Sequence, residues 1–273
     1  MNKAITPEKE QEDQALKVRM SQIRHTMLVL SGKGGVGKST VAVNLATELA
    51  REGQRVGLLD VDIHGPSIPG MFGMDDRKLY STGNAMIPVE YTANLSIMSI
   101  GFLLQSREDA VIWRGPLKYN VIRQFIANVE WGDLDYLIVD CPPGTGDEPL
   151  SIAQIVGKGA GAVVVTTPQR VSIDDVRKSI QFCRKLDITV LGVIENMSGF
   201  TCPHCGETVD IFDAGGGEEL AREANVPFLG RIPIEPNVVR SCDKGTPFVI
   251  ADNESGVTQA FRKAVRDIMT ALQ

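Results

Sequence analysis

The feature that most constrains the fold is a glycine-rich turn, Gly32–Thr40, lying between two apolar segments. The segment before it, Met27–Leu30, is typical of a buried strand, and the segment after it, Val41–Ala50, is typical of a helix. Glycines let the backbone N–H groups of such a turn point inward, and the N-terminus of the helix adds partial positive charge. A strand, this turn and a helix, with Lys-Ser where the turn ends, form the pattern of a nucleotide-binding P-loop.

Each position of this turn has an expected role. Lys38 is expected to neutralise the β- and γ-phosphates of a nucleotide, and the hydroxyl of Ser39 is expected to bind Mg²⁺. The remaining residues of the phosphate cradle are Gly34, Gly35, Val36, Gly37 and Thr40.

Acidic residues end two further apolar segments. Arg55–Asp62 is predicted to be a strand that closes on Asp60 and Asp62, and Asp135–Asp140 is predicted to be a strand that closes on Asp140. Because the carboxyl ends of parallel strands meet at one edge of a sheet, these carboxylates are expected beside the P-loop. Asp140 matches the Walker-B pattern that supports Mg²⁺, and the two earlier aspartates suit a water-orienting or Mg²⁺-linked role.

The loop after Asp140 contains two further positions of interest. Gly144 is expected to offer a backbone N–H group near the γ-phosphate. Asp147 is expected to be the N-cap of a helix that starts at Glu148.

Apolar strand-like segments alternate with helical ones along the rest of the chain, which predicts an α/β fold with one doubly wound, mostly parallel sheet. Residues 1–25 are predicted to form a polar arm with a frayed or surface-lying helix, and residues 26–273 a single domain. The sequence pattern also predicts an added strand or hairpin within Tyr80–Leu104 and a final helix over Ser255–Leu272.

Composition narrows the class of protein. The net charge is −6 and no long basic run occurs, so nucleic acid is not the expected partner. No signal pattern opens the sequence and no run approaches about 18 apolar residues, so a cytoplasmic protein without a membrane span is expected. Five cysteines are too few for a disulfide scaffold in 273 residues, which favours a reducing compartment.

Two of the cysteines form the motif Cys202-Pro-His-Cys205-Gly, which interrupts the α/β alternation after the strand predicted at Thr189–Glu195. Paired thiolates on one turn suit zinc and iron–sulfur clusters equally, and a redox disulfide is a third possibility. Both metal sites usually require four ligands, whereas the other three cysteines are scattered and His204 is not expected to contribute. A second copy of the chain, related by a two-fold axis, would complete the site.

Together these motifs resemble the Mrp/ApbC/Nbp-type family of iron–sulfur cluster carriers, which belongs to the deviant P-loop ATPases of the MinD and ParA class. The early Lys33 within the P-loop is the mark of that class. The segments that carry the resemblance span roughly residues 25 to 250. They are Gly32–Thr40, Asp60–Ser67, Trp113–Pro116, Asp140–Asp147, Glu195–Ser198 and Cys202–Cys205.

The resemblance implies slow, Mg²⁺-dependent ATP hydrolysis by a homodimer. It implies that Lys33 reaches the partner's phosphates, that Asp62 orients the attacking water, and that Asn196 contacts adenine with Pro233 to Glu235 nearby. It further implies that Cys202 and Cys205 of two subunits hold one labile 4Fe–4S cluster for transfer to apo-proteins.

Two other functions remain open from the sequence. One is a MinD- or ParA-type positioning ATPase, for which the apolar face of Ser255–Leu272 would lie on a membrane, although a helix docked on the sheet is the simpler expectation. The other is an ATPase whose cysteine motif binds structural zinc. A paralogue as the second subunit is a further possibility.

Overall fold

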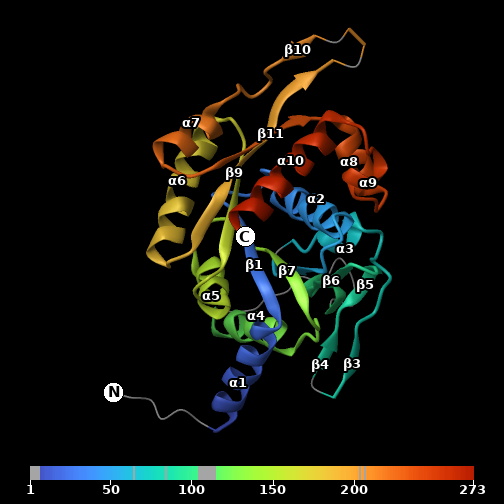
Figure 1. The fold of residues 1–273 in the computed structure, drawn as a ribbon, viewed down its shortest axis with the longest axis vertical. Coiled ribbons are helices and arrows are strands. Elements are labelled where there is room, and N and C mark those ends of the chain that lie inside the picture. The colour runs from blue at the N-terminus through green and yellow to red at the C-terminus, as the bar shows by residue number, and fades with distance from the viewer. Residues whose placement is uncertain (1–6, 64, 84, 104–114, 203, 206) are drawn as a thin grey trace.

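A twisted, mostly parallel sheet forms the centre of the molecule (Figure 1). The computed structural model describes residues 7–63, 65–83, 85–103, 115–202, 204–205 and 207–273. In the described part the main sheet has the strand order β10-β9-β8-β1-β7-β2-β6-β5, with β11 paired to β9. Among the described strands of this sheet, only β10 and β5 run antiparallel to their neighbours. The α/β doubly wound fold predicted from the sequence is therefore confirmed.

The strands of the main sheet are short and apolar at its centre. Their bounds are β1 Ile23–Ser31, β2 Val56–Asp60, β5 Val89–Thr92, β6 Leu95–Ser99, β7 Leu134–Asp140, β8 Gly161–Thr166, β9 Thr189–Thr201, β10 Thr208–Val209 and β11 Phe228–Ile234. A separate hairpin pairs β3 Tyr80–Thr82 with β4 Ala85–Ile87. The extra strands expected within Tyr80–Leu104 are thus present.

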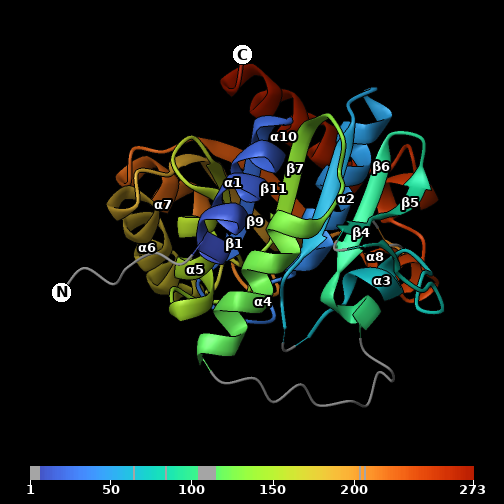
Figure 2. The same ribbon diagram turned by 90° about the horizontal axis from the view of Figure 1, so that it is seen from below.

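Helices cover both faces of the sheet. Their bounds are α1 Pro7–Ser21, α2 Lys38–Arg51, α3 Ile68–Met71, α4 Gly115–Asn128, α5 Asp147–Val156, α6 Arg170–Lys185, α7 Gly216–Glu223, α8 Pro236–Asp243, α9 Phe248–Ala251 and α10 Gly256–Ala271, with a 3-10 turn, η1, at Ile100–Leu103. Helices α2 and α10 lie together on one side, and α4 and α5 lie on the other (Figure 2).

The apolar side chains of strand β1 lie on both faces of the sheet, so both faces must be packed against helices. Its side chains alternate between the two cores: Met27 and Val29 pack with α2 and α10, whereas Leu28 and Leu30 pack with α4 and α5. All four are at most 1% exposed, which is the burial expected of a central parallel strand.

The N-terminal helix is packed more closely than the sequence suggests. Helix α1 contacts α4 and β1, and Leu16 and Met20 pack against the core. An ion pair joins Asp13 to Arg123 of α4. Strand β1 begins at Ile23, so the boundary expected at residue 26 falls inside this strand.

The final helix is docked on the molecule. Phe261, Val265 and Ile268 of α10 are at most 1% exposed, and the helix packs on β11 and α2. Arg262 also donates to Glu48 of α2 across 2.9 Å. The docked helix expected for Ser255–Leu272 is confirmed, and its apolar face is covered by the sheet.

Replacing Phe261 by alanine tests this packing. Removing a fully buried phenyl ring leaves a cavity, so Phe261→Ala should lower the free energy of unfolding by about 3–5 kcal/mol. Tyr80→Ala is a matched control because Tyr80 is 76% exposed, and it should change stability by about 0.5 kcal/mol or less. Denaturant titration checks both values, and equal effects would contradict the docked position of α10.

Candidate functional site

The P-loop joins the end of β1 to the start of α2 as predicted. Gly35 and Gly37 have φ values of 79° and 81°, in the left-handed region that favours glycine. Gly37 is the N-cap residue of α2, and because it has no side chain it makes no side-chain hydrogen bond to the first N–H groups of the helix. The N-terminus of α2 is therefore available to an anion such as a phosphate group.

The ammonium group of Lys38 lies among acidic side chains. Its Nζ atom is 2.6 Å from Asp140 Oδ1, 3.3 Å from Ser39 Oγ and 3.8 Å from Asp62 Oδ2. Burial alone would lower the pKa of Lys38, but attraction to Asp140 and the hydrogen bond to it outweigh burial and leave the pKa raised. Lys38 is therefore held charged in the position where phosphate would bind.

The two strand-end aspartates are neighbours in the sheet. Asp60 of β2 is in register with Asp140 of β7, and both are fully buried. Asp60 accepts hydrogen bonds from Ser99 Oγ at 2.8 Å and from the backbone N–H of Asp62 at 3.1 Å. Burial, with repulsion from Asp140, raises the pKa of Asp60 to about 7. Burial also raises the pKa of Asp140, against the opposing effect of Lys38.

One oxygen in this cluster has no partner. Asp140 Oδ2 is buried and accepts no hydrogen bond from any part of the chain that the structure describes. Buried carboxylate oxygens normally bind a donor or a metal ion, and hydroxyl and carboxylate oxygens are ligands that Mg²⁺ accepts directly or through water. With Ser39 Oγ also beside Lys38, the residues present fit a magnesium–nucleotide complex.

Gly144 lies next to the P-loop but its N–H group is engaged. It donates to Ser31 O at 2.8 Å, and its φ of 90° requires glycine.

Asp147 differs from expectation: it is the first residue of α5, and Gly146 occupies the N-cap position. The Asp147 carboxylate therefore lies in the first helical turn, where its negative charge interacts favourably with the dipole of α5 although it does not cap the helix. Trp113 and Arg114 lie outside the described residues.

Lys33 lies on the outer part of the P-loop and is partly exposed. Its backbone carbonyl accepts from Ser31 Oγ at 3.0 Å, which fixes the turn without using the ammonium group. Gly32, just before it, packs so tightly on α6 that an added Cβ atom would lie 2.6 Å from Asp175. This contact could not be predicted from the sequence, because the two residues are far apart along the chain.

The residues expected near adenine come together where the middle of β9 pairs with the end of β11. Asn196 Nδ2 donates to Val36 O of the P-loop at 2.9 Å, and Asn196 is in register with Ile232, the neighbour of Pro233. Glu235 is the N-cap of α8 and accepts from the backbone N–H of Asn237 at 3.1 Å. The structure thus brings Asn196 against the P-loop itself.

Strand β9 continues past the predicted end at Glu195 and carries the cysteine motif away from the sheet. It runs to Thr201 and pairs with β10, forming a hairpin that projects at the end of the molecule opposite α1 (Figure 1). We call residues 199–214 the cysteine hairpin; residues 203 and 206 lie outside the described part.

The two thiols of this hairpin are accessible and close together. Cys202 is partly exposed and Cys205 is exposed, whereas Cys141, Cys183 and Cys242 are buried. The backbone N–H groups of Cys205 and His204, together with the Cys205 thiol, lower the pKa of Cys202. Hydrogen bonds of this kind favour a thiolate, the form that binds metal. Burial raises the pKa of Cys183 to about 12, so this buried cysteine stays a thiol.

Glu195 was not among the site residues predicted from the sequence. This side chain is fully buried at the base of the cysteine hairpin and accepts from Ser198 Oγ and from the backbone of Gly215 and Gly217. A carboxylate closing an apolar strand was the only available signal, and its partners could not be inferred from spacing.

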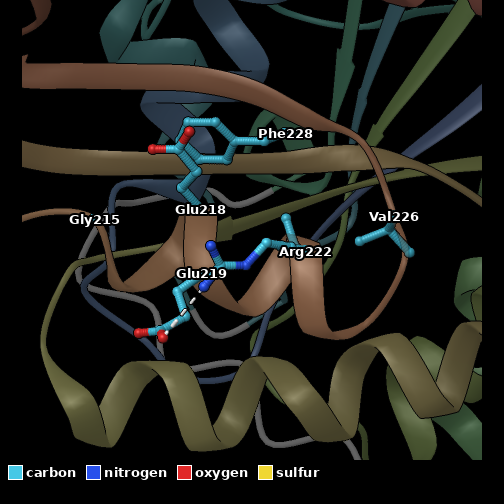
Figure 3. A pocket seen from close by; sticks show the side chains of 7 residues that line it. Gly215, Glu218, Glu219, Arg222, Val226 and Phe228 are labelled. Carbon is cyan, nitrogen blue, oxygen red and sulfur yellow. Dashed lines mark hydrogen bonds and ion pairs between the residues drawn. The ribbon is translucent and has the colours of Figure 1, made fainter.

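A surface hollow lies apart from the phosphate cradle. It has a volume of about 400 Å³ and follows α7, where Glu219 and Arg222 form an ion pair (Figure 3). Its lining residues are Gly215, Glu218, Glu219, Ala221, Arg222, Val226 and Phe228. None of them belongs to the P-loop or to the cysteine hairpin.

No helix in the described part of the chain is both long and apolar enough to cross a bilayer.

A P-loop on a mostly parallel sheet, with Lys38 beside strand-end aspartates, defines a P-loop NTPase. The family model described as NUBPL iron-transfer P-loop NTPase matches residues 22–269, and the chain belongs to this family.

Similar proteins span nearly the whole chain. The cytosolic Fe-S cluster assembly factor NUBP2 of Gallus gallus is 48% identical over 259 residues, covering 93% of this chain and 95% of its own. The iron-sulfur cluster carrier protein of Methanocaldococcus jannaschii is 48% identical over 263 residues, which cover 96% of this chain and 90% of that protein. A nucleotide-binding protein from Archaeoglobus fulgidus, solved with ADP, has a TM-score of 0.79 and 39% identity, with coverages of 91% and 96%.

The raised pKa of Asp60 gives a pH-dependent prediction. Since this pKa is about 7 in the folded protein against an ordinary 3.8, the native state binds more protons between these values. Ionisation of Asp60 therefore lowers the free energy of unfolding progressively as the pH rises from 3.8 to about 7. In nucleotide-free protein, Asp60→Asn should become more stable relative to the original chain as pH rises from about 4 to 8.

Denaturant titration across the pH range measures this difference. Asp133→Asn serves as a control because the Asp133 side chain is 72% exposed, and its difference from the original chain should vary little with pH. A flat difference for Asp60→Asn would contradict the assignment of the raised pKa to this buried carboxyl.

Proposed function

We propose that the protein is an ATP-hydrolysing iron–sulfur cluster carrier of the cytoplasm. A labile 4Fe–4S cluster is its cargo, held between two copies of the chain by Cys202 and Cys205 of each, and apo-proteins receive the cluster. The observation that carries this proposal is an accessible pair of adjacent thiols on a projecting hairpin of an iron-transfer P-loop NTPase. The names of the similar proteins, which refer to cytosolic assembly and to cluster carriage, agree with it.

Ligand number supports the two-chain arrangement. A cubane cluster in proteins is held by four cysteine thiolates. No group of three or more His, Cys, Asp or Glu side chains suited to a metal occurs among the described residues. One chain thus supplies two thiols, and a second copy across a two-fold axis supplies the other two.

For hydrolysis, we assign the P-loop residues to ATP. The backbone of Gly34, Gly35, Val36 and Gly37 cradles the phosphates, with Lys38, Ser39 and Thr40 at the start of α2. Ser39, Asp60 and Asp140 would hold magnesium, which would supply positive charge to the phosphates.

Further residues complete this site. Asp62 orients the attacking water, and Lys33 reaches the phosphates bound by the partner. Gly144 contacts the γ-phosphate after releasing Ser31 O, while Asn196, Pro233 and Glu235 border the adenine. The placement of Asp62 beside Lys38 and of Asn196 against the P-loop supports these assignments.

The two sites are expected to act in sequence. ATP bound by both subunits draws them together through Lys33, which changes the spacing of the paired cysteine hairpins, and hydrolysis releases them. The nucleotide state would therefore control loading or transfer of the cluster. A positioning ATPase is less well supported, because the apolar face of α10 is buried in the fold.

Removing the P-loop lysine tests the link between ATP and delivery. Lys38→Ala should lower ATP turnover by about 100-fold or more, since it deletes the charge that stabilises the developing phosphate negative charge. Cluster delivery to an apo acceptor should be lost while loading in vitro stays mostly intact. Lys158→Ala is the control, because the Lys158 side chain is 82% exposed on the surface. Unimpaired delivery by Lys38→Ala would refute nucleotide gating.

Changing one cysteine tests the cargo. Anaerobically reconstituted protein should show broad visible absorption and contain iron, and Cys202→Ser should lose both because it leaves too few thiolates. Cys242→Ser should retain them, as Cys242 is buried. The outcome that would favour a structural zinc site instead is bound zinc with no visible absorption in the unaltered protein.

A further inference from the structure

The base of the cysteine hairpin is closed by a single buried carboxylate. Glu195 is fully buried, and its Oε1 atom accepts from Ser198 Oγ at 2.5 Å and from the Gly215 N–H at 3.0 Å. Ser198 lies just before the hairpin and Gly215 lies just after it. One carboxylate oxygen therefore holds together the two points where the hairpin leaves and rejoins the fold.

The other oxygen of Glu195 is fixed on α7. Its Oε2 atom accepts from the Gly217 N–H at 2.5 Å, in the first turn of that helix, where the helix dipole favours an anion. A Cβ atom at Gly217 would lie 2.9 Å from this oxygen, so glycine is needed for the close approach. Arg231 Nε, 3.5 Å from Oε1, adds a positive charge. The carboxylate is thus anchored from several sides.

The next residue along β9 contacts the nucleotide site. Asn196 Nδ2 donates to Val36 O at 2.9 Å, and a Cβ atom at Gly37 would lie 2.2 Å from the same nitrogen. The backbone then turns sharply, because Met197 has a φ of 56° and Gly199 has a φ of 80°. The consecutive side chains of Glu195 and Asn196 therefore contact the hairpin base and the P-loop respectively. Because the two residues are adjacent, a movement of one backbone position is passed directly to the other.

We propose that Glu195 is a positioning residue that, together with Asn196, ties the order of the cysteine hairpin to the state of the P-loop. A nucleotide that moves the backbone at Val36 and Gly37 shifts Asn196, and Glu195 transmits the shift to both ends of the hairpin. The purpose of this link rests on the proposed function, since it would bring Cys202 and Cys205 under nucleotide control. The link itself concerns the chain alone and can be tested without a cluster.

Hydrogen exchange of the cluster-free, full-length protein tests the proposal, with and without Mg²⁺ and a non-hydrolysable ATP analogue. In the unaltered protein, the nucleotide should change amide exchange in the cysteine hairpin. Glu195→Gln replaces one acceptor oxygen by a donor and removes the charge, so hairpin amides should exchange about tenfold faster. Their response to nucleotide should be lost, while nucleotide affinity stays within about threefold, which a general loss of structure would not produce.

Glu218→Gln is the matched control. Glu218 also pairs with Arg231, at 2.5 Å, but its side chain is 57% exposed along the hollow of Figure 3. This variant should keep both the protection of the hairpin and its response to nucleotide.

Three results would overturn the proposal. They are a hairpin that ignores nucleotide in the unaltered protein, a Glu195→Gln variant that responds normally, and loss of the response in Glu218→Gln. If Glu195→Gln fails to fold, Ser198→Ala removes one of the ties, and a normal response in that variant is equally contradictory. Failure of cluster binding, by contrast, would refute the proposed function and leave this exchange result unchanged.

Discussion

The buried ion pair between Lys38 and Asp140 sets the conditions for the rest of the nucleotide site. Removing an ammonium group from water is unfavourable unless an opposite charge lies close by, and Asp140 lies 2.6 Å away. The second carboxylate, Asp60, is also buried and lies beside Asp140, and burial together with repulsion from Asp140 raises its pKa to about 7. The unpartnered oxygen of Asp140 lies in this same cluster. The arrangement favours a ligand that brings a cation to the aspartates and pairs its own negative charge with Lys38.

Strand β9 connects this cluster to the thiols. It passes the P-loop at Asn196, turns at Met197 and Gly199, and emerges as the cysteine hairpin. The P-loop contact and the cysteine hairpin therefore lie on one continuous strand, and the anchor at Glu195 stands immediately before Asn196. A rigid anchor matters for an exposed hairpin, because such an element has few buried contacts of its own and would otherwise open easily.

Most of the architecture could be predicted because it depends on local pattern. The apolar runs Met27–Leu30 and Tyr136–Val139 are buried on both faces, and the acids that end the strands meet at one edge of the sheet as topology requires. The missed features depend on pairing partners that no local pattern reveals. The extension of β9 to Thr201 needs β10, and the bond from Asn196 to Val36 joins positions 160 apart in sequence. Asp147 was misassigned because either glycine or aspartate can precede a helix, and Gly146 takes that place.

Native mass spectrometry of the anaerobically reconstituted protein tests the central claim most directly, because it counts chains and clusters in one intact species. The account predicts two chains carrying one 4Fe–4S cluster, and only single chains without a cluster for Cys202→Ser. A single chain carrying a complete cluster would contradict it, and so would a two-chain species carrying zinc in place of iron.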